Sequence, residues 1–353
     1  MIIRNIILTC QLKMQDDRSI SAVYYVLQGK KSIQSIQDAQ LYHLTAFYSI
    51  YKDLSKQRFE ELIEQYVEEQ MLNPLGENKF VVTDKGRKWL LQNPLSMDYI
   101  NGERFKQIDH IFYSRLQLLV QVWTNHKKNN NTYLPIVEQS DILHWMKTYY
   151  SYTKNNIINN LRVLYQELVA ILSKLPREDP PIFIEQLTSE GKIGLTIEQI
   201  SFKTGLSVED IYLKTVNIIH LMLQTVKKDQ EKYQILSSIA NDLVIQSTIT
   251  HSAEQTNNLL NKGYSLKEIA NIRSLKINTI YDHVVEIALH DDYFPLSQYV
   301  SPSHQQEIVH VIERNQSYKL KTIKAEVSEE ISYFQIRLVL TKMNNCLHGV
   351  VHG

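Results

Sequence analysis

Apolar residues recur at helical spacing along most of the chain. Between residues 59 and 71 they stand three or four positions apart, and Ser55 precedes them as a helix cap. A turn follows, then a short β-like run at residues 80–82, then a further helix near Arg87. This order is typical of a winged-helix domain, so the pattern predicts a winged-helix-like domain over residues 1–92. A plain helical bundle with one loop is the alternative.

Helices joined by polar loops are also predicted for residues 93–180, which we interpret as a helical middle domain. The helix over residues 157–175 has apolar positions that indicate core or an interdomain face. A proline pair at residues 180 and 181 lies in a polar loop after this helix. Because proline disfavours a continuing helix, this loop is predicted to be the boundary of the middle domain.

A short helix, a tight turn and a longer helix then occur twice. In the first copy, Thr196 and Gln199 can form a capping box, and Ser207 can cap a longer helix that carries residues 211–226. This second helix is apolar nearly all round, which indicates burial. Residues 181–250 are therefore predicted to be a helix-turn-helix-like helical unit with a structural role or a protein interface. Its apolar helix and the N-terminal domain are the two candidate surfaces for docking a partner protein.

In the second copy, Gly263 ends the preceding helix, and Ser265 and Glu268 can form another capping box. The helix after the turn has its core positions between residues 277 and 288. Residues 251–353 are therefore predicted to be a helix-turn-helix domain. The predicted fold class is mainly α, with an N-terminal winged-helix-like domain, a helical middle and this C-terminal helix-turn-helix domain.

The second copy carries the candidate chemistry. A recognition helix meets DNA with its N-terminal residues, where Asn and Thr can bond base edges while Lys and Arg bind phosphates. Residues 262–283 hold four cations against Glu268 and Asp282. The alternative is that this helix packs on another protein. The candidate DNA-binding residues are Lys262, Lys267, Arg273, Lys276, Asn278, Thr279, Tyr281 and His283.

Charge and cysteine content narrow the class of protein. The 353 residues include 38 Lys and Arg and 38 Asp and Glu, so the chain is formally neutral, which argues against a protein that coats DNA through bulk charge. Cys10 and Cys346 are too few for a disulfide framework or a Cys-rich zinc domain. Apolar stretches are too short to span a membrane. We expect a cytoplasmic, nucleoid-associated protein.

Enzymatic motifs are missing from the sequence. A phosphate-binding loop needs a glycine five positions before its Gly-Lys pair, but Tyr24 and Gln186 stand there relative to Gly29 and Gly191. The run of residues 290–292 is interpreted as a helix end. Cys346, His348 and His352 are interpreted as part of a fraying C-terminus rather than a metal site. We therefore expect no catalytic residues, no cofactor and no bound metal.

Residues 261–284 and 329–340 resemble the helicase-associated helix-turn-helix domain found at the C-terminus of some RecQ-type helicases. The whole chain, including residues 29–38, is similar to the YpbB family of Firmicutes. This resemblance implies a non-catalytic subunit that supplies DNA-binding modules to a RecQ-like DNA helicase in DNA repair and recombination. It implies weak, non-specific DNA binding by the chain alone. Two alternatives stay open: a stand-alone helix-turn-helix transcriptional regulator and a scaffold that binds only protein.

Overall fold

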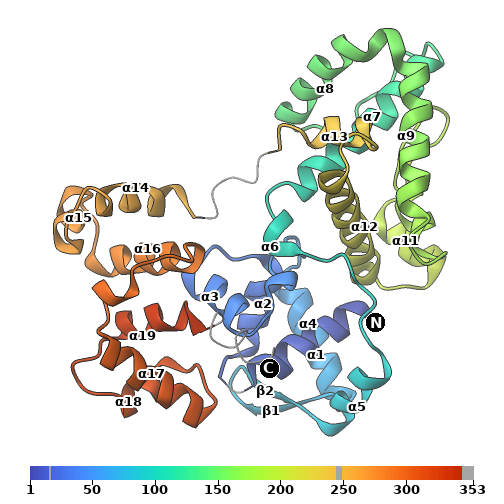
Figure 1. Cartoon of the computed structure of the whole chain (residues 1–353). Helices are drawn as coiled ribbons and strands as arrows, with labels where there is room; N and C mark the ends of the chain where they lie inside the picture. The colour runs from blue at the N-terminus through green and yellow to red at the C-terminus, as the bar shows by residue number, and fades with distance from the viewer. Residues whose placement is uncertain (16, 244–248, 344–353) are drawn as a thin grey trace. The chain divides into compact units, whose positions relative to one another are not determined.

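The computed structural model describes residues 1–15, 17–243 and 249–343. These residues are mostly helical and include one two-stranded hairpin (Figure 1). The predicted mainly-α fold class is therefore confirmed. Within the described ranges, no helix has the length and apolar character needed to cross a membrane.

The described residues form two compact units. Unit 1 consists of residues 1–7, 49–52 and 91–243, and unit 2 consists of residues 8–48 without residue 16, 53–90 and 249–343. Helix α1 (Ile2–Met14) is divided between them. The four-domain division at residues 92, 180 and 250 stays a prediction.

Unit 1 is helical in its described part, apart from loops and an isolated β-bridge between Ser189 and Lys192. Its elements are α6 (Gly102–Phe105), α7 (Asp109–Lys127), α8 (Ser140–Thr153), η2 (Lys154–Asn156), α9 (Ile157–Leu172), α10 (Asp179–Ile184), α11 (Ile197–Thr204), α12 (Val208–Lys228) and α13 (Gln234–Ala240).

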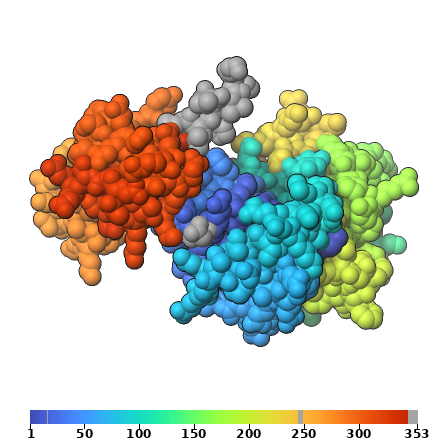
Figure 2. Space-filling model, turned by 90° about the horizontal axis from the view of Figure 1, so that it is seen from below, coloured from blue at the N-terminus to red at the C-terminus, as the bar shows by residue number. Residues whose placement is uncertain are grey.

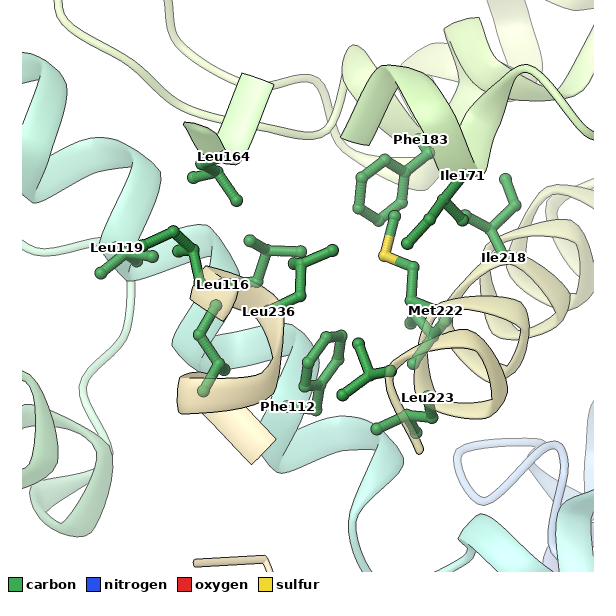
Figure 3. Close-up of a cluster of buried hydrophobic side chains, with 14 of the residues drawn as sticks. Phe112, Leu116, Leu119, Leu164, Ile171, Phe183, Ile218, Met222, Leu223 and Leu236 are labelled. Atoms are coloured by element: carbon green, nitrogen blue, oxygen red, sulfur yellow. The ribbon is translucent and has the colours of Figure 1, made fainter. Parts of the chain in front are cut away.

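The core of unit 1 lies where α7, α9, α12 and α13 meet. Phe112, Leu164, Met222 and Leu236, one from each helix, converge in this cluster (Figure 3). Helix α12 is buried along most of its length, as its all-round apolar sequence predicts. Its apolar surface is therefore part of the core.

The proline pair lies at the start of a helix. Leu175 and Phe183, on either side of it, belong to the same hydrophobic cluster. Pro180 and Pro181 lie in the first turn of α10, where the missing N–H groups cost nothing because that turn has no intrahelical acceptors. The prolines thus begin a helix within unit 1, and the domain boundary at residue 180 stays a prediction.

A buried carboxylate fixes α13 to α9. Glu167 accepts hydrogen bonds from the backbone N–H groups of Ile235 and Leu236, each at 2.9 Å. These N–H groups belong to the first turn of α13, so Glu167 satisfies donors that the helix cannot satisfy itself. Burial raises the pKa of this carboxyl above its ordinary value. The inner side of α9 therefore packs in the core and holds α13.

Unit 2 contains the hairpin and the remaining helices. Its elements are α2 (Ile20–Gln28), α3 (Ile33–Leu41), η1 (Thr45–Phe47), α4 (Lys56–Glu68), β1 (Leu72–Gly76), β2 (Lys79–Val82), α5 (Asp84–Gln92), α14 (His251–Leu260), α15 (Leu266–Ile272), α16 (Ile277–His290), η3 (Leu296–Gln298), α17 (Pro302–Asn315), α18 (Leu320–Glu326) and α19 (Tyr333–Leu340).

The order predicted for residues 55–91 is present in unit 2. Ser55 caps α4 by accepting from the N–H of Arg58, and β1 pairs antiparallel with β2. Thr83 caps α5, and a side chain at Gly86 would meet the Met71 carbonyl oxygen at 2.6 Å. Glycine therefore allows α5 to lie directly against the start of the hairpin. Assignment of residues 1–92 to a winged-helix domain stays a prediction.

The segment of residues 29–38 is structural. Gly29 ends α2 in the left-handed region at φ 75°, and Ser32 caps α3. Asp38 is buried and pairs with Arg18 at 2.8 Å. Gln37 donates to the backbone carbonyl of Arg337 at 3.0 Å, so α3 is bonded to α19 within unit 2.

Candidate nucleic-acid interface

Helices α14, α15 and α16 form the predicted helix-turn-helix (Figure 1). The capping box at the start of α15 is present: Ser265 accepts from the N–H of Glu268, and Glu268 accepts from the N–H of Ser265. Ser274 adopts a left-handed conformation at φ 52° in the turn between α15 and α16. These local features place α16 as the second helix of the motif.

The N-terminus of α16 is open. Lys276 occupies its N-cap position, and no side chain in the described chain caps it. Unsatisfied N–H groups and the helix dipole give such an end a partial positive charge, which favours a phosphate. Lys276 and Asn278 are exposed there, and Thr279 is half-buried.

The next turn of α16 is occupied by α19. Tyr281 stacks on Phe334 with ring centroids 4.2 Å apart, and Asp282 forms an ion pair with Arg337 at 2.7 Å. Tyr281 was a candidate DNA-binding residue, but the structure leaves it and Asp282 only half-exposed. The exposed part of α16 is therefore its first turn.

Arg273 was predicted to be a free phosphate-binding cation, but its guanidinium is bonded within the domain. It donates to the backbone carbonyl of Ser252 at 2.7 Å, to the Ser252 hydroxyl at 3.0 Å and to Gln255 at 2.9 Å. It also contacts the hydroxyl of Thr256. All three partners belong to α14, so Arg273 fastens the turn to that helix.

His283 is buried, contrary to its predicted exposure. Its Nδ1 atom lies 2.9 Å from the Thr256 hydroxyl and faces Arg273, which can only donate. Nδ1 is therefore the acceptor nitrogen of a neutral ring. Burial and the charge of Arg273 lower the pKa of His283. Its position three residues after buried Ile280 is a core signal that was readable in the sequence.

The candidate residues left on the surface are Lys262, Lys267, Lys276 and Asn278, with Thr279 partly covered. Among the described residues, none of these three lysines forms an ion pair. Asn271 and Ser274 are also exposed beside the turn and were not predicted. Nothing in the pattern separates these two from ordinary surface positions.

The surface around this motif belongs to one body. In Figure 2 the residues of α14 to α19, coloured orange to red, form a continuous surface.

Within the described ranges, no group of His, Cys, Asp or Glu side chains is arranged to hold a metal ion. Cys346, His348 and His352 lie outside the described residues.

Comparison with known proteins places this geometry in a family context. A family model described as a helix-turn-helix domain matches residues 252–340. The chain is similar to protein YpbB of Bacillus subtilis (strain 168), with 30% identity over 341 residues, which is 95% of this chain and 96% of that protein. No solved structure matches the chain.

Proposed function

The chain belongs to the YpbB family, and on that premise we propose that it is a non-catalytic, DNA-binding accessory subunit of a RecQ-family DNA helicase, acting in DNA repair and recombination. The observation that carries this proposal is the open N-terminus of α16. Its uncapped first turn presents Lys276 and Asn278 within a helix-turn-helix domain.

The charges at this site suit weak, sequence-indifferent binding. Lys262, Lys267 and Lys276 are exposed, and the acidic residues of this segment are Glu268 and Asp282, of which Asp282 pairs with Arg337. Glu268 is held by Ser265 through hydrogen bonds. A few phosphate contacts give non-specific dissociation constants of roughly 10⁻⁴ to 10⁻⁶ M at physiological salt. The affinity of such a module for DNA rises most when another DNA-binding protein holds it near the duplex.

The absence of a phosphate loop from the sequence supports a role without ATP hydrolysis. A motor must then come from a partner. Two weak DNA contacts linked in one complex strengthen binding by roughly 10²–10⁴ without any new contact. A helicase core that carries the ATP site and a subunit that carries the helix-turn-helix domain would gain in this way.

We assign the docking of the helicase to the N-terminal part of unit 2. Helix α12, the other candidate from sequence, has its apolar surface in the core of unit 1. A groove of about 260 Å³ lies between α2, α4 and the hairpin, lined by Tyr24, Phe59, Ile63 and Phe80. The exposed side of α4 carries Glu60 and Glu64 beside this groove, and Lys56 pairs with Glu60 at 3.5 Å. The remaining negative charge of Glu64 suits a basic protein surface better than DNA.

The test is co-expression of the chain with each RecQ-like helicase of the same cell, followed by size exclusion and an unwinding assay. We expect one helicase to co-elute at micromolar concentration and to unwind DNA better than it does alone. If none co-elutes, the helicase-subunit proposal fails. Footprinting then distinguishes the alternatives, because a transcriptional regulator protects a defined operator and a protein scaffold protects none.

A further inference from the structure

Helix α9 has an outer face that unit 1 does not cover. Ile158, Arg162, Tyr165 and Val169 recur every three or four residues, so they share one side of the helix. All four are exposed, and Tyr165 is 69% exposed. Tyr152, in the last turn of α8, is 83% exposed. We call these five residues and Lys154 the α9 face.

The segment that contains the α9 face is rich in basic residues. Residues 142–177 contain five Lys and Arg residues and a single acidic residue, Glu167. Glu167 is buried and its carboxylate caps α13, whereas all five cations are exposed. This segment therefore carries an excess of positive charge, and exposed Asp141 and Glu178 flank it in the sequence.

The side chains of the α9 face are free to bind. Along the described parts of the chain, Lys154 and Arg162 form no ion pair, and neither Tyr152 nor Tyr165 has an aromatic ring partner. Exposed amides stand beside them at Asn159 and Gln166. The cations, aromatic rings and amide groups on the end of α8, on η2 and on α9 match the three kinds of contact that a single nucleic-acid strand offers.

A membrane surface fits these observations less well. An interfacial helix buries a broad apolar face in lipid, but the broad apolar side of α9 is already buried in the core through Leu164 and Ile171. The outer stripe is narrow and is interrupted by Arg162 and bordered by amides. Phosphates and unstacked bases are complementary to such a surface, because the rings can stack on bases while the cations bind the backbone.

We propose that the α9 face binds single-stranded DNA. The binding surface lies in unit 1 and is built from residues that take no part in the helix-turn-helix. It extends the proposed function, since an unwinding complex produces single strands, but it does not depend on any helicase partner. The chain alone then has two DNA surfaces with different preferences, α16 for duplex and the α9 face for a single strand.

The test measures binding of the full chain to a fluorescent oligothymidine strand of about 20 nucleotides, which exceeds the usual single-site length. In Tyr152→Ala/Tyr165→Ala we expect affinity for the strand to fall at least about fivefold per tyrosine, since stacking of one base contributes this much or more. In Lys154→Glu/Arg162→Glu we expect a shallower salt dependence of binding. The slope of the logarithm of the binding constant against the logarithm of the salt concentration should fall in magnitude by about 1.4, which is about 0.7 for each lost phosphate contact.

Matched control variants test whether the loss of binding is specific to the α9 face or follows from removing any exposed ring or cation. Phe202→Ala/Tyr293→Ala removes two aromatic rings that are 93% and 94% exposed elsewhere, and should bind the strand like the parent chain. Lys31→Glu/Lys88→Glu changes two exposed lysines outside the α9 face and should also leave binding unchanged.

A hairpin duplex tested in parallel distinguishes this proposal from the proposed function. We expect the α9-face variants to bind duplex normally and Lys262→Glu/Lys267→Glu/Lys276→Glu to bind the single strand normally. The proposal is overturned if the tyrosine variant keeps parental affinity for the strand, if the controls lose as much, or if the parent chain binds phosphatidylserine vesicles and not the strand. If the parent chain binds the single strand but does not bind the duplex, the α9 face keeps its support and the proposed duplex site at α16 loses it.

Discussion

The two helix-turn-helix units have the same framework. Each begins with a capping box, at Thr196 in one and at Ser265 in the other. In each, the second helix starts after its N-cap residue eleven positions later, at Ser207 and Lys276. The turn contains a left-handed residue in both, Gly205 at φ 72° and Ser274 at φ 52°.

They differ at the start of the second helix. In the first unit Ser207 caps α12, and Glu209 and Asp210 are buried. Asp210 accepts the N–H of Ile3 at 3.0 Å, so this helix end is used to hold α1. In the second unit no side chain within the described residues caps α16.

The same motif is thus closed in one unit and open in the other. The difference lies in the N-cap and the two or three residues after it, while the buried framework is shared, with Ile211 and Ile280 in equivalent buried positions. Helix-turn-helix geometry by itself therefore identifies a packing unit, and its ability to meet DNA depends on these few positions.

The largest expected effect concerns Arg273 and the equivalent Thr204, which lie at the C-terminal end of the first helix of each unit. Arg273→Ala removes at least four hydrogen bonds to α14 and should destabilise the domain by about 2 kcal/mol. Thr204, at the equivalent position, bonds only its own turn, so Thr204→Ala should cost less than about 1 kcal/mol. Urea unfolding of both variants measures this, and equal losses would contradict the structural role of Arg273.

The next effect concerns the third residue of each second helix. Asp210→Ala should destabilise the chain by about 1–2 kcal/mol, because the buried N–H of Ile3 loses its acceptor, and should leave DNA affinity unchanged. Thr279→Ala should change stability by less than about 0.5 kcal/mol and weaken duplex binding. Unfolding curves and fluorescence anisotropy of both variants measure stability and duplex affinity. If Asp210→Ala weakens duplex binding and Thr279→Ala destabilises the chain, the proposed difference between the two helix ends is wrong.

A smaller effect follows from exchanging the caps. Lys276→Ser gives α16 the cap that Ser207 gives α12, and should stabilise the domain by about 0.5–1 kcal/mol. The same change should weaken duplex binding, since a hydroxyl then occupies the N–H groups and a cation is lost. Thermal unfolding and anisotropy measure both. Stabilisation without loss of DNA affinity would show that this helix end does not meet phosphate.

The smallest effect is the pH dependence of stability. The pKa of His283 is lowered in the folded domain by burial and by Arg273, so the unfolded chain takes up a proton first as pH falls. Stability should therefore be lost as pH falls below about 6.5, the unfolded value. His283→Gln should lose less stability over the same range. Burial also lowers the pKa of His220, but His220 is present in both the parent chain and the variant. If both proteins lose stability equally as pH falls, His283 does not contribute to the pH dependence.

Local features of the fold were predictable from sequence, and tertiary ones were not. The caps at Ser55, Thr196, Ser207 and Ser265 depend on residues three positions apart, and all four are present. Arg273 was misassigned because its partners lie in α14, about twenty residues earlier in the chain, where no periodicity indicates them.

The surface of α9 illustrates the same limit. Its sequence shows apolar positions on more than one side, and spacing alone assigned the whole helix to core or an interdomain face. Only the packing of α7, α12 and α13 determines that Leu164 is covered while Tyr165 stays exposed. Periodicity identifies apolar faces but does not indicate which one finds a neighbour.

The central claim is that α16 delivers DNA affinity to a helicase complex. It is tested most directly by measuring duplex affinity of the co-purified complex with the parent chain, with Lys262→Glu/Lys267→Glu/Lys276→Glu, and with the charge-matched control Lys31→Glu/Lys88→Glu/Lys321→Glu. All six lysines are exposed, so each variant should fold and co-purify normally. The account predicts at least tenfold weaker binding, about 1.4 kcal/mol, for the α16 variant alone, with a salt dependence shallower by up to about 2.7 logarithmic units. Equal affinity of the two variants would contradict it.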